Sequence, residues 1–172
     1  MRLSYYLLIT LIAVSCSDDV GLSFDENNGG LFLPEGFKAL VVHEGVGKSR
    51  HIAVNHNGDL YVKLAKDFGR DGNVALRDEN GDGKAEIIQR FGDYPNDGRF
   101  ATEMKINDGY LYYSSERVVY RQRLNSKKLV PDSPVEVILT DPFPIRWHNS
   151  KSIAFDKENN MYVTFSGFTN SC

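Results

Sequence analysis

The residue types best suited to acid–base chemistry gather in residues 147–152, which read WHNSKS. His148 can act as a base near neutral pH, and Lys151 can hold an anionic cofactor or stabilise an oxyanion. Residues of similar types precede the apolar segments that begin at Ile52 and Met104. The whole set of candidate site residues comprises Arg50, His51, Arg99, Glu103, His148 and Lys151. We predict one ligand site at which Arg50, Arg99 and Lys151 bind an anionic cofactor. The alternative is a set of solvated surface residues or satisfied caps.

An acidic segment, residues 78–86, offers a second kind of chemistry. Oxygens at Asp78, Asn80 and Asp82, with a glycine behind them, match the first half of a calcium-binding loop. The glutamate that closes such a loop at its last position is absent, because Gln89 stands there. The alternative is a plain hairpin turn, for which Asn-Gly and Asp-Gly are preferred dipeptides. The predicted ligands of a structural calcium ion are Asp78, Asn80, Asp82 and Glu86.

These candidates need elements that position them, and an internal repeat supplies such elements. A unit of two short strands joined by a tight turn occurs at residues 52–62, 104–113 and 153–163, reading IAVNHNGDLYV, MKINDGYLYY and IAFDKENNMYV. In the first copy, Asn57-Gly58 is the two-residue signal for a tight hairpin. The copies follow one another at steps of about 50 residues, and a fixed period of that length marks a repeat architecture. One tyrosine near the end of each copy is expected to pack between repeats, namely Tyr61, Tyr112 and Tyr162.

Two further strand-like stretches lie in each complete period. They are residues 73–77, 87–91, 118–121 and 135–139. Four short strands per period, without a long stretch of helical periodicity, are typical of a β-propeller blade. We predict an all-β fold in which residues 33–172 form about two and a half blades of a β-propeller, with a first strand at residues 39–42. Because the first strand of each blade lines the central channel, the candidate site residues are expected to surround one funnel.

The beginning of the chain is predicted to lie outside this fold. Arg2, the apolar residues 7–12 and the small residues ahead of Cys16 resemble a bacterial lipoprotein signal. The prediction is a signal peptide over residues 1–15, a lipid anchor on Cys16 and a flexible tether over residues 16–32. The protein would then be attached to the outer membrane of a bacterial cell envelope, facing the periplasm or the cell surface. The alternative is an ordinary secretory signal with an unrelated cysteine.

The composition is that of a folded globular protein, with 41% hydrophobic and 25% charged residues. The net charge is -3, and the lysines and arginines are scattered among acidic residues. Such a chain has no basic surface for phosphate groups, so we predict no nucleic-acid partner.

Residues 148–155, HNSKSIAF, resemble the segment of the glucose/sorbosone dehydrogenase family that carries its catalytic histidine. Residues 50–62 and 74–85 are similar to the sorbosone dehydrogenase-like branch. Members of this family are six-bladed propellers that use pyrroloquinoline quinone (PQQ) with calcium to oxidise sugars. The resemblance implies that His148 is the general base for the substrate hydroxyl, with PQQ and calcium as cofactors. It also implies a sugar or a related polyol or aldehyde as substrate, and an external electron acceptor such as a cytochrome.

The chain departs from the family pattern in two places. Relatives often have a pair of cysteines after the glycine, whereas residues 168–172 offer only Cys172, and Glu103 stands where relatives tend to have a small residue. The chain is expected to be the N-terminal part of a longer protein. An alternative function is a non-catalytic surface propeller that binds a glycan or a protein through the same funnel. A third alternative is an inactive product, because two and a half blades do not close a channel.

Overall fold

The computed structural model describes residues 21–65, 71–94, 103–143, 151–165 and 167, apart from the side chains of residues 71 and 93. In this part of the chain there is one short 3-10 helix, η1 (Asn28–Gly30), and no α-helix. All other regular structure is β-strand. No helix in the described part is long and apolar enough to cross a membrane.

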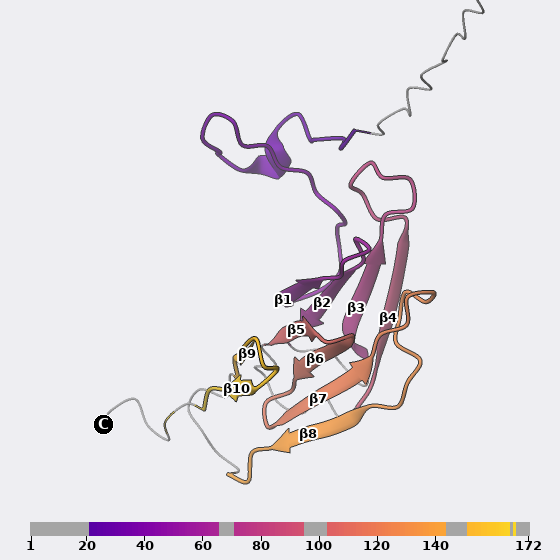
Figure 1. Ribbon diagram of the computed structural model, residues 1–172. Coiled ribbons are helices and arrows are strands. Elements are labelled where there is room, and N and C mark those ends of the chain that lie inside the picture. The colour runs from indigo at the N-terminus through magenta and orange to yellow at the C-terminus, as the bar shows by residue number, and fades with distance from the viewer. Residues whose placement is uncertain (1–20, 66–70, 95–102, 144–150, 166, 168–172) are drawn as a thin grey trace, which may run out of the picture.

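The strands form three antiparallel sheets, in which each strand pairs with its neighbours in sequence (Figure 1). Sheet 1 contains β1 (Ser49–Val54), β2 (Leu60–Leu64), β3 (Asp71–Arg77) and β4 (Ile87–Asp93). Sheet 2 contains β5 (Met104–Asn107), β6 (Tyr110–Ser114), β7 (Val118–Arg123) and β8 (Glu136–Thr140). Sheet 3 contains β9 (Ile153–Phe155) and β10 (Met161–Val163). The two four-strand sheets and the two-strand sheet confirm the strand pattern predicted from the repeat.

The turns between the first two strands differ from sheet to sheet. β5 and β6 are joined by Asp108-Gly109, whose φ angles of 45° and 72° are both positive, as a two-residue type I′ turn requires. In sheet 1 the turn is longer than Asn57-Gly58 predicts. The reason is that the Asn55 amide donates to the Asp59 carbonyl at 2.8 Å, and only Gly58 of this turn takes a positive φ. Asn57-Gly58 therefore predicted the position of the turn correctly, but its length incorrectly.

Asp59 anchors the turn of sheet 1 from the inside. Its carboxylate accepts hydrogen bonds from Arg77 Nε and Nη2, each at 2.7 Å, and from Asn57 Nδ2 at 2.9 Å. Burial on its own raises the pKa of Asp59, but these hydrogen bonds outweigh it and lower the pKa below its ordinary value. The β1–β2 turn is thereby tied to the end of β3.

Aromatic side chains fill the space between sheet 1 and sheet 2. Tyr61, Tyr94 and Tyr113 are buried there, and the ring centroids of Tyr94 and Tyr113 lie 4.9 Å apart. The Tyr61 hydroxyl donates a hydrogen bond to the Leu129 carbonyl at 2.9 Å. Burial raises the pKa of Tyr61 to about 12, because the phenolate would lose its hydration. The tyrosine of the first repeat therefore packs between repeats, as predicted.

The contact between sheet 2 and sheet 3 uses the equivalent tyrosine. Tyr112 is buried, and its ring centroid lies 4.7 Å from that of Phe155. Tyr162 behaves differently, because its side chain is 59% exposed and its hydroxyl donates to Asp156 Oδ2 at 3.0 Å. The packing prediction is thus confirmed for the first two copies and stays a prediction for Tyr162, because no described strand covers that side chain.

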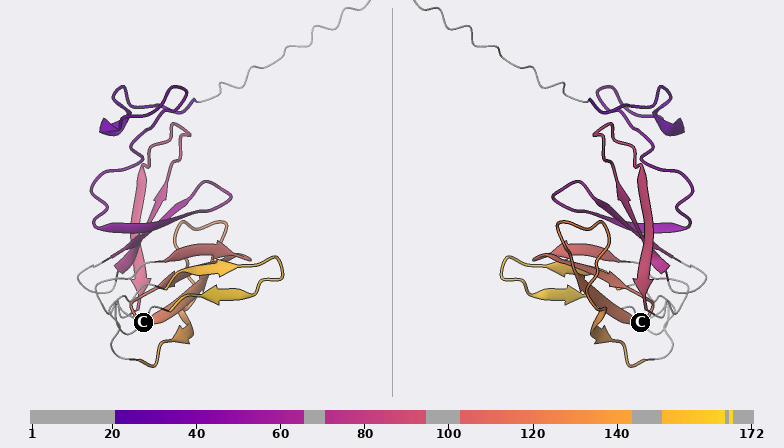
Figure 2. Two further views of the ribbon diagram at one scale, coloured as in Figure 1. Left: turned by 90° about the vertical axis from the view of Figure 1, so that its left-hand side faces the viewer. Right: turned by 90° about the vertical axis from the view of Figure 1, so that its right-hand side faces the viewer.

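Residues 39–42 do not form the predicted first strand. A strand requires a ladder of backbone partners, and the backbone of this segment is bonded elsewhere. The Val41 amide donates to Asp25 Oδ2 at 2.6 Å, and the Ala85 amide donates to the Val42 carbonyl at 2.9 Å. Residues 21–32, which were assigned to the tether, therefore contact this segment and lie beside the β3–β4 turn (Figure 2). The boundaries of the signal, tether and propeller stay predictions.

Candidate functional site

The first strands of the three sheets, β1, β5 and β9, lie side by side (Figures 1 and 2). This arrangement brings together the residues that stand at the beginning of each strand, as the propeller prediction expects. We call the region formed by Arg50, His51, Glu103 and Lys151 the inner edge. Two other predicted site residues, Arg99 and His148, lie outside the described residues, as does the predicted lipid anchor Cys16.

Glu103 connects all three sheets at the inner edge. Its side chain is almost fully buried, with Oε1 accepting a hydrogen bond from the Met104 amide at 3.0 Å and Oε2 accepting one from the Ile153 amide at 3.1 Å. On the side of sheet 1, His51 Nδ1 lies 3.3 Å from Oε1. A buried carboxylate needs such donors, because they replace the water that it loses. One side chain therefore holds the starts of β5 and β9 together and contacts β1.

Arg50 occupies a β-bulge at the start of β1. Ser49 pairs with Leu64 and His51 pairs with Lys63, so Arg50 is an extra residue in β1. It is exposed, and a bulge changes the direction of the side chains beside it. This exposure is compatible with both the predicted cofactor contact and the alternative of a solvated surface residue, so the role of Arg50 stays a prediction.

Lys151, a predicted cofactor ligand, forms a buried ion pair in this structure. Its ammonium Nζ lies 3.0 Å from Asp141 Oδ2, and only 1% of each side chain is exposed. Nζ also lies 5.2 Å from the centre of the Phe165 ring. The charge of Lys151 is thus compensated inside the protein, since a buried lysine needs a partner for its charge. In this structure the ammonium is engaged by Asp141, so binding an anionic cofactor would require that pair to separate.

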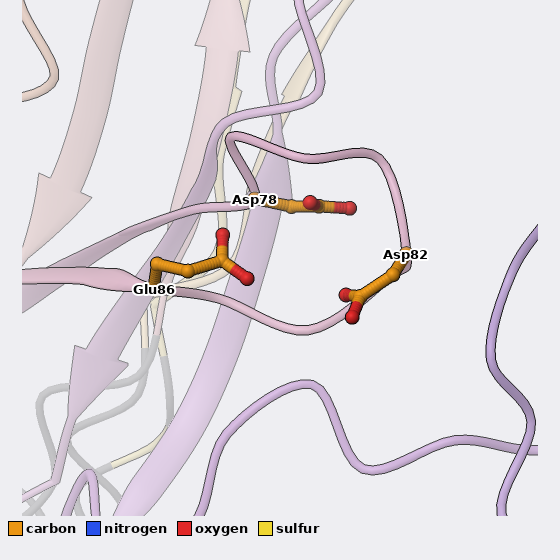
Figure 3. A group of neighbouring side chains, drawn as sticks. All are labelled: Asp78, Asp82 and Glu86. Carbon is orange, nitrogen blue, oxygen red and sulfur yellow. The ribbon is translucent and has the colours of Figure 1, made fainter. Parts of the chain in front are cut away.

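The β3–β4 turn brings together three of the four predicted calcium ligands. Oxygens of Asp78, Asp82 and Glu86 all lie within 4.8 Å of one another. Figure 3 shows these three carboxylates pointing toward the inside of the loop. The Asn80 side chain is engaged within the loop, because its Oδ1 accepts from the Asp82 amide and its Nδ2 donates to Glu86 Oε1, both at 2.8 Å. Hard cations prefer such carboxylate oxygens, so this acidic loop, residues 78–86, has the ligand type that calcium needs.

Backbone amides hold the carboxylates of the acidic loop in place. Asp78 accepts from the Gly81 amide at 2.6 Å and from the Gly83 amide at 2.7 Å. Glu86 Oε2 accepts from the Glu79 amide at 2.8 Å. These bonds fix the carboxylates close together despite their like charges, because each amide offsets part of the negative charge. The loop is therefore preorganised by its own backbone.

Sequence reasoning missed one residue that shapes the inner edge, Asp141, and the role of a second, Glu103. Asp141 stands before the segment of candidate residues, and no motif in the sequence connects it to Lys151. Glu103 is among the candidate site residues predicted from the sequence, but its role in joining the sheets was not predicted, although its type and position gave a usable signal. A carboxylate directly ahead of a strand that starts in the core must find donors. That requirement alone predicts a buried hydrogen-bonded role.

The sequence matches no protein-family model, and no curated protein matches it significantly. Solved structures do resemble it. The PQQ domain of pyranose dehydrogenase from Coprinopsis cinerea, in its holo form, matches with a TM-score of 0.60 and 14% identity, covering 75% of this chain and 30% of that chain. The chain is part of a β-propeller. The repeated antiparallel sheets, arranged around one edge, and the likeness to this domain lead to that conclusion.

A second solved enzyme shows the same propeller likeness. Two structures of a carbohydrate-active enzyme of family AA12 from Trichoderma reesei match with 18% identity each. The iodide structure has a TM-score of 0.59 and the calcium structure one of 0.58. They cover 76% and 75% of this chain, and 33% and 32% of the matched chains. This chain thus spans about a third of the length of the propellers that it resembles.

Proposed function

We propose that this chain belongs to a PQQ-dependent oxidoreductase that oxidises a sugar or a related polyol or aldehyde and passes electrons to an external acceptor such as a cytochrome. The observation that carries the proposal is the propeller likeness to a PQQ domain that is named as part of a pyranose dehydrogenase. The sorbosone dehydrogenase-like sequence pattern supports the same chemistry. Because the chain spans about a third of its structural neighbours, the activity is proposed for the polypeptide as it occurs in its own cell.

The described residues of the inner edge fit an anionic group in part. PQQ carries carboxylates and, when bound, would accept a hydride, and with it the two electrons of the oxidation, from the substrate. Arg50 offers an exposed guanidinium on its bulge, and the charge of Glu103 is offset by two amides. The Lys151 ammonium does not add to the positive charge, because it is paired with Asp141. The site thus supplies one described cation, and Arg99 is proposed as a second.

His148 is proposed as the base that takes the proton from the substrate hydroxyl. This role rests on the sequence pattern around residues 148–155, which lead directly into β9. An imidazole suits the role because its ordinary pKa lies near neutrality. The buried pair of Lys151 and Asp141 and the bond from the Ile153 amide to Glu103 fix the chain just after this histidine.

Calcium is proposed at the acidic loop as a structural ion, with Asp78, Asp82 and Glu86 as ligands. The clustering of their oxygens supports this role, and the predicted ligand Asn80 stays possible, because its Oδ1 accepts from the Asp82 amide and has a second lone pair. We also propose that Cys16 carries a lipid anchor that attaches the protein to the outer membrane of the cell envelope. That proposal rests on the signal-like residues 1–15 alone.

The proposed activity is tested on the native polypeptide purified from its own membrane fraction. PQQ and calcium are titrated first, and sugar-dependent reduction of a dye is then measured for the wild type and for His148→Ala. The proposal expects quinone binding in both proteins and dye reduction in the wild type only. Absence of quinone binding, or dye reduction that is unchanged in His148→Ala, would contradict it.

A non-catalytic glycan-binding propeller is the second candidate function. One observation favours it: the only lysine of the inner edge is neutralised, and a carboxylate lies at its centre. Such an edge suits a neutral hydroxyl-rich ligand better than a polyanionic one. Glycan binding that survives His148→Ala, in a protein that does not bind PQQ, would support this second function.

A further inference from the structure

His51 has a defined orientation at the inner edge. It lies on β1 on the same face as the buried Ala53, so its side chain points toward sheet 2, where Glu103 lies. His51 Nδ1 is 3.3 Å from Glu103 Oε1, and 38% of the His51 side chain is exposed. Within the described residues, no hydrogen bond or ion pair reaches the other ring nitrogen, Nε2. One nitrogen thus faces a buried carboxylate, and within the described residues the other takes part in no hydrogen bond or ion pair, on a side chain that is partly exposed.

The surroundings of Glu103 determine which nitrogen of His51 carries the proton. An ionised carboxylate only accepts hydrogen bonds, and its two oxygens are held in place by the amides of Met104 and Ile153. A neutral imidazole beside it is stabilised when Nδ1 carries the hydrogen. The lone pair then stays on Nε2, the nitrogen that the described residues leave without a hydrogen bond. Glu103 can therefore hold the imidazole of His51 in the tautomer in which Nε2 is a hydrogen-bond acceptor.

The bulge at the start of β1 puts an exposed cation, Arg50, directly before His51 in the chain. A guanidinium donates hydrogen bonds, whereas His51 Nε2 accepts them. A hydroxyl group can donate a hydrogen bond to His51 Nε2 and accept one from the Arg50 guanidinium. Neighbouring hydroxyls of a sugar or polyol match such a pair of complementary groups.

We propose that His51 is a ligand-contacting residue of the inner edge, at which Nε2 accepts a hydrogen bond from a hydroxyl of a sugar or polyol, and that Glu103 is the residue that positions it. The class of ligand rests on the proposed function, while the pairing of His51 with Glu103 does not. The contact is a hydrogen bond without transfer of a group. It adds a specific recognition residue to a site whose proposed base is His148.

The pairing is tested by nitrogen NMR of the full chain with labelled histidine, at a pH at which the imidazole is neutral. In the wild type, the His51 resonances should show the proton on Nδ1 and a bare Nε2. In Glu103→Gln, whose amide can also donate, this preference should be lost. His56→Asn is the matched control, because His56 is an exposed histidine of the β1–β2 turn, and it should leave His51 unchanged. A wild-type His51 with its proton on Nε2 would overturn the pairing without reference to any variant.

The ligand contact is tested by titrating the same labelled protein with D-glucose. The expected result is a shift of His51 Nε2 on saturation, and a dissociation constant about tenfold weaker in His51→Asn, as the loss of one hydrogen bond predicts. His56→Asn should bind like the wild type. Glucose that leaves His51 Nε2 unshifted, or binds equally to His51→Asn, would overturn the ligand role.

These outcomes are separate from those of the proposed function. PQQ binding and dye reduction by the native polypeptide test the oxidoreductase, and neither enters the NMR measurement. A protein without quinone binding but with the Nδ1 proton and the glucose shift would keep this inference and lose the enzyme proposal. A protein that reduces the dye while its His51 fails the NMR tests would keep the enzyme proposal and lose this inference.

Discussion

The inner edge and the acidic loop both gather ionised side chains, but they compensate charge in opposite ways. At the inner edge, Lys151 and Asp141 form a buried pair, and Glu103 is buried among amides from two sheets. In the acidic loop, three carboxylates from nine consecutive residues lie close together near the surface, held by amides of the same loop. The inner edge should therefore depend on the fold for its stability, whereas the loop should depend on a cation.

The largest expected effect comes from breaking the buried ion pair of the inner edge. Lys151→Met leaves the Asp141 carboxylate buried without its cation, which should lower the free energy of unfolding by about 3–5 kcal/mol. Chemical denaturation of the full chain measures this loss. Lys128→Met is the matched control, because Lys128 and Asp132 form an exposed pair that water and salt screen, so its loss should change stability little. A loss in Lys151→Met as small as that of the control would contradict the buried pair.

The second effect concerns the acidic loop and depends on calcium. Calcium at a hundred times its dissociation constant should stabilise the folded chain by about 2.7 kcal/mol, because it binds the folded state only. The stabilisation is measured as a rise in Tm on adding calcium and its reversal by a chelator. Asp82→Asn should abolish most of this rise, while magnesium should reproduce little of it. An equal Tm with and without calcium would leave the loop as a plain turn.

A smaller loss is expected from removing the carboxylate that links the three sheets. Glu103→Ala leaves the Met104 and Ile153 amides without their acceptor and should cost about 1–3 kcal/mol in the free energy of unfolding. Urea unfolding measures it, with Glu158→Ala as control. Glu158 is an exposed glutamate of the β9–β10 turn, so its loss should change stability by less than about 0.5 kcal/mol. Equal stability of the two variants would show that Glu103 does not hold the inner edge together.

The smallest expected effect is a pH dependence at the turn of sheet 1. The pKa of Asp59 is lowered from its ordinary value of 3.8 by hydrogen bonds from Arg77 and Asn57, which outweigh burial. Its stabilising contribution is therefore present above pH 3.8 and is lost as the pH falls through the lowered pKa. Acid titration of the unfolding free energy should show this loss in the wild type, and Asp59→Asn should lack it. If the unfolding free energy fell equally at acid pH in both proteins, Asp59 would not be the source of the loss.

Local features of this fold could be predicted from the sequence. The repeated unit of two short strands joined by a tight turn indicated the strand pairs, and Asp108-Gly109 forms a two-residue turn. The acidic loop was predicted for the same reason, since its ligands and the amides that hold them lie within nine residues. The prediction was less good at Asn57-Gly58, where the pairing of Asn55 with Asp59 lengthened the turn. Turn length depends on a contact that the dipeptide does not contain.

Long-range features could not be predicted from the same patterns. Residues 39–42 look like a strand, but their backbone bonds to Asp25 and to the β3–β4 turn. Lys151 looks like a cofactor ligand, but Asp141 engages it from the other side of a connecting segment. In both cases the deciding partner is far enough away in the sequence that no spacing rule connects the two residues.

The sequence by itself determined the all-β class, the two complete four-strand repeats and the acidic loop, because these follow from interactions between residues that are near one another in the chain. Only the tertiary structure decided that Glu103 contacts His51 and binds the start of β9, and that Lys151 is paired. Stacking the sheets removes water from these groups. A charged group that has lost its hydration needs a compensating partner, and the packing of the neighbouring sheet determines which group lies within reach.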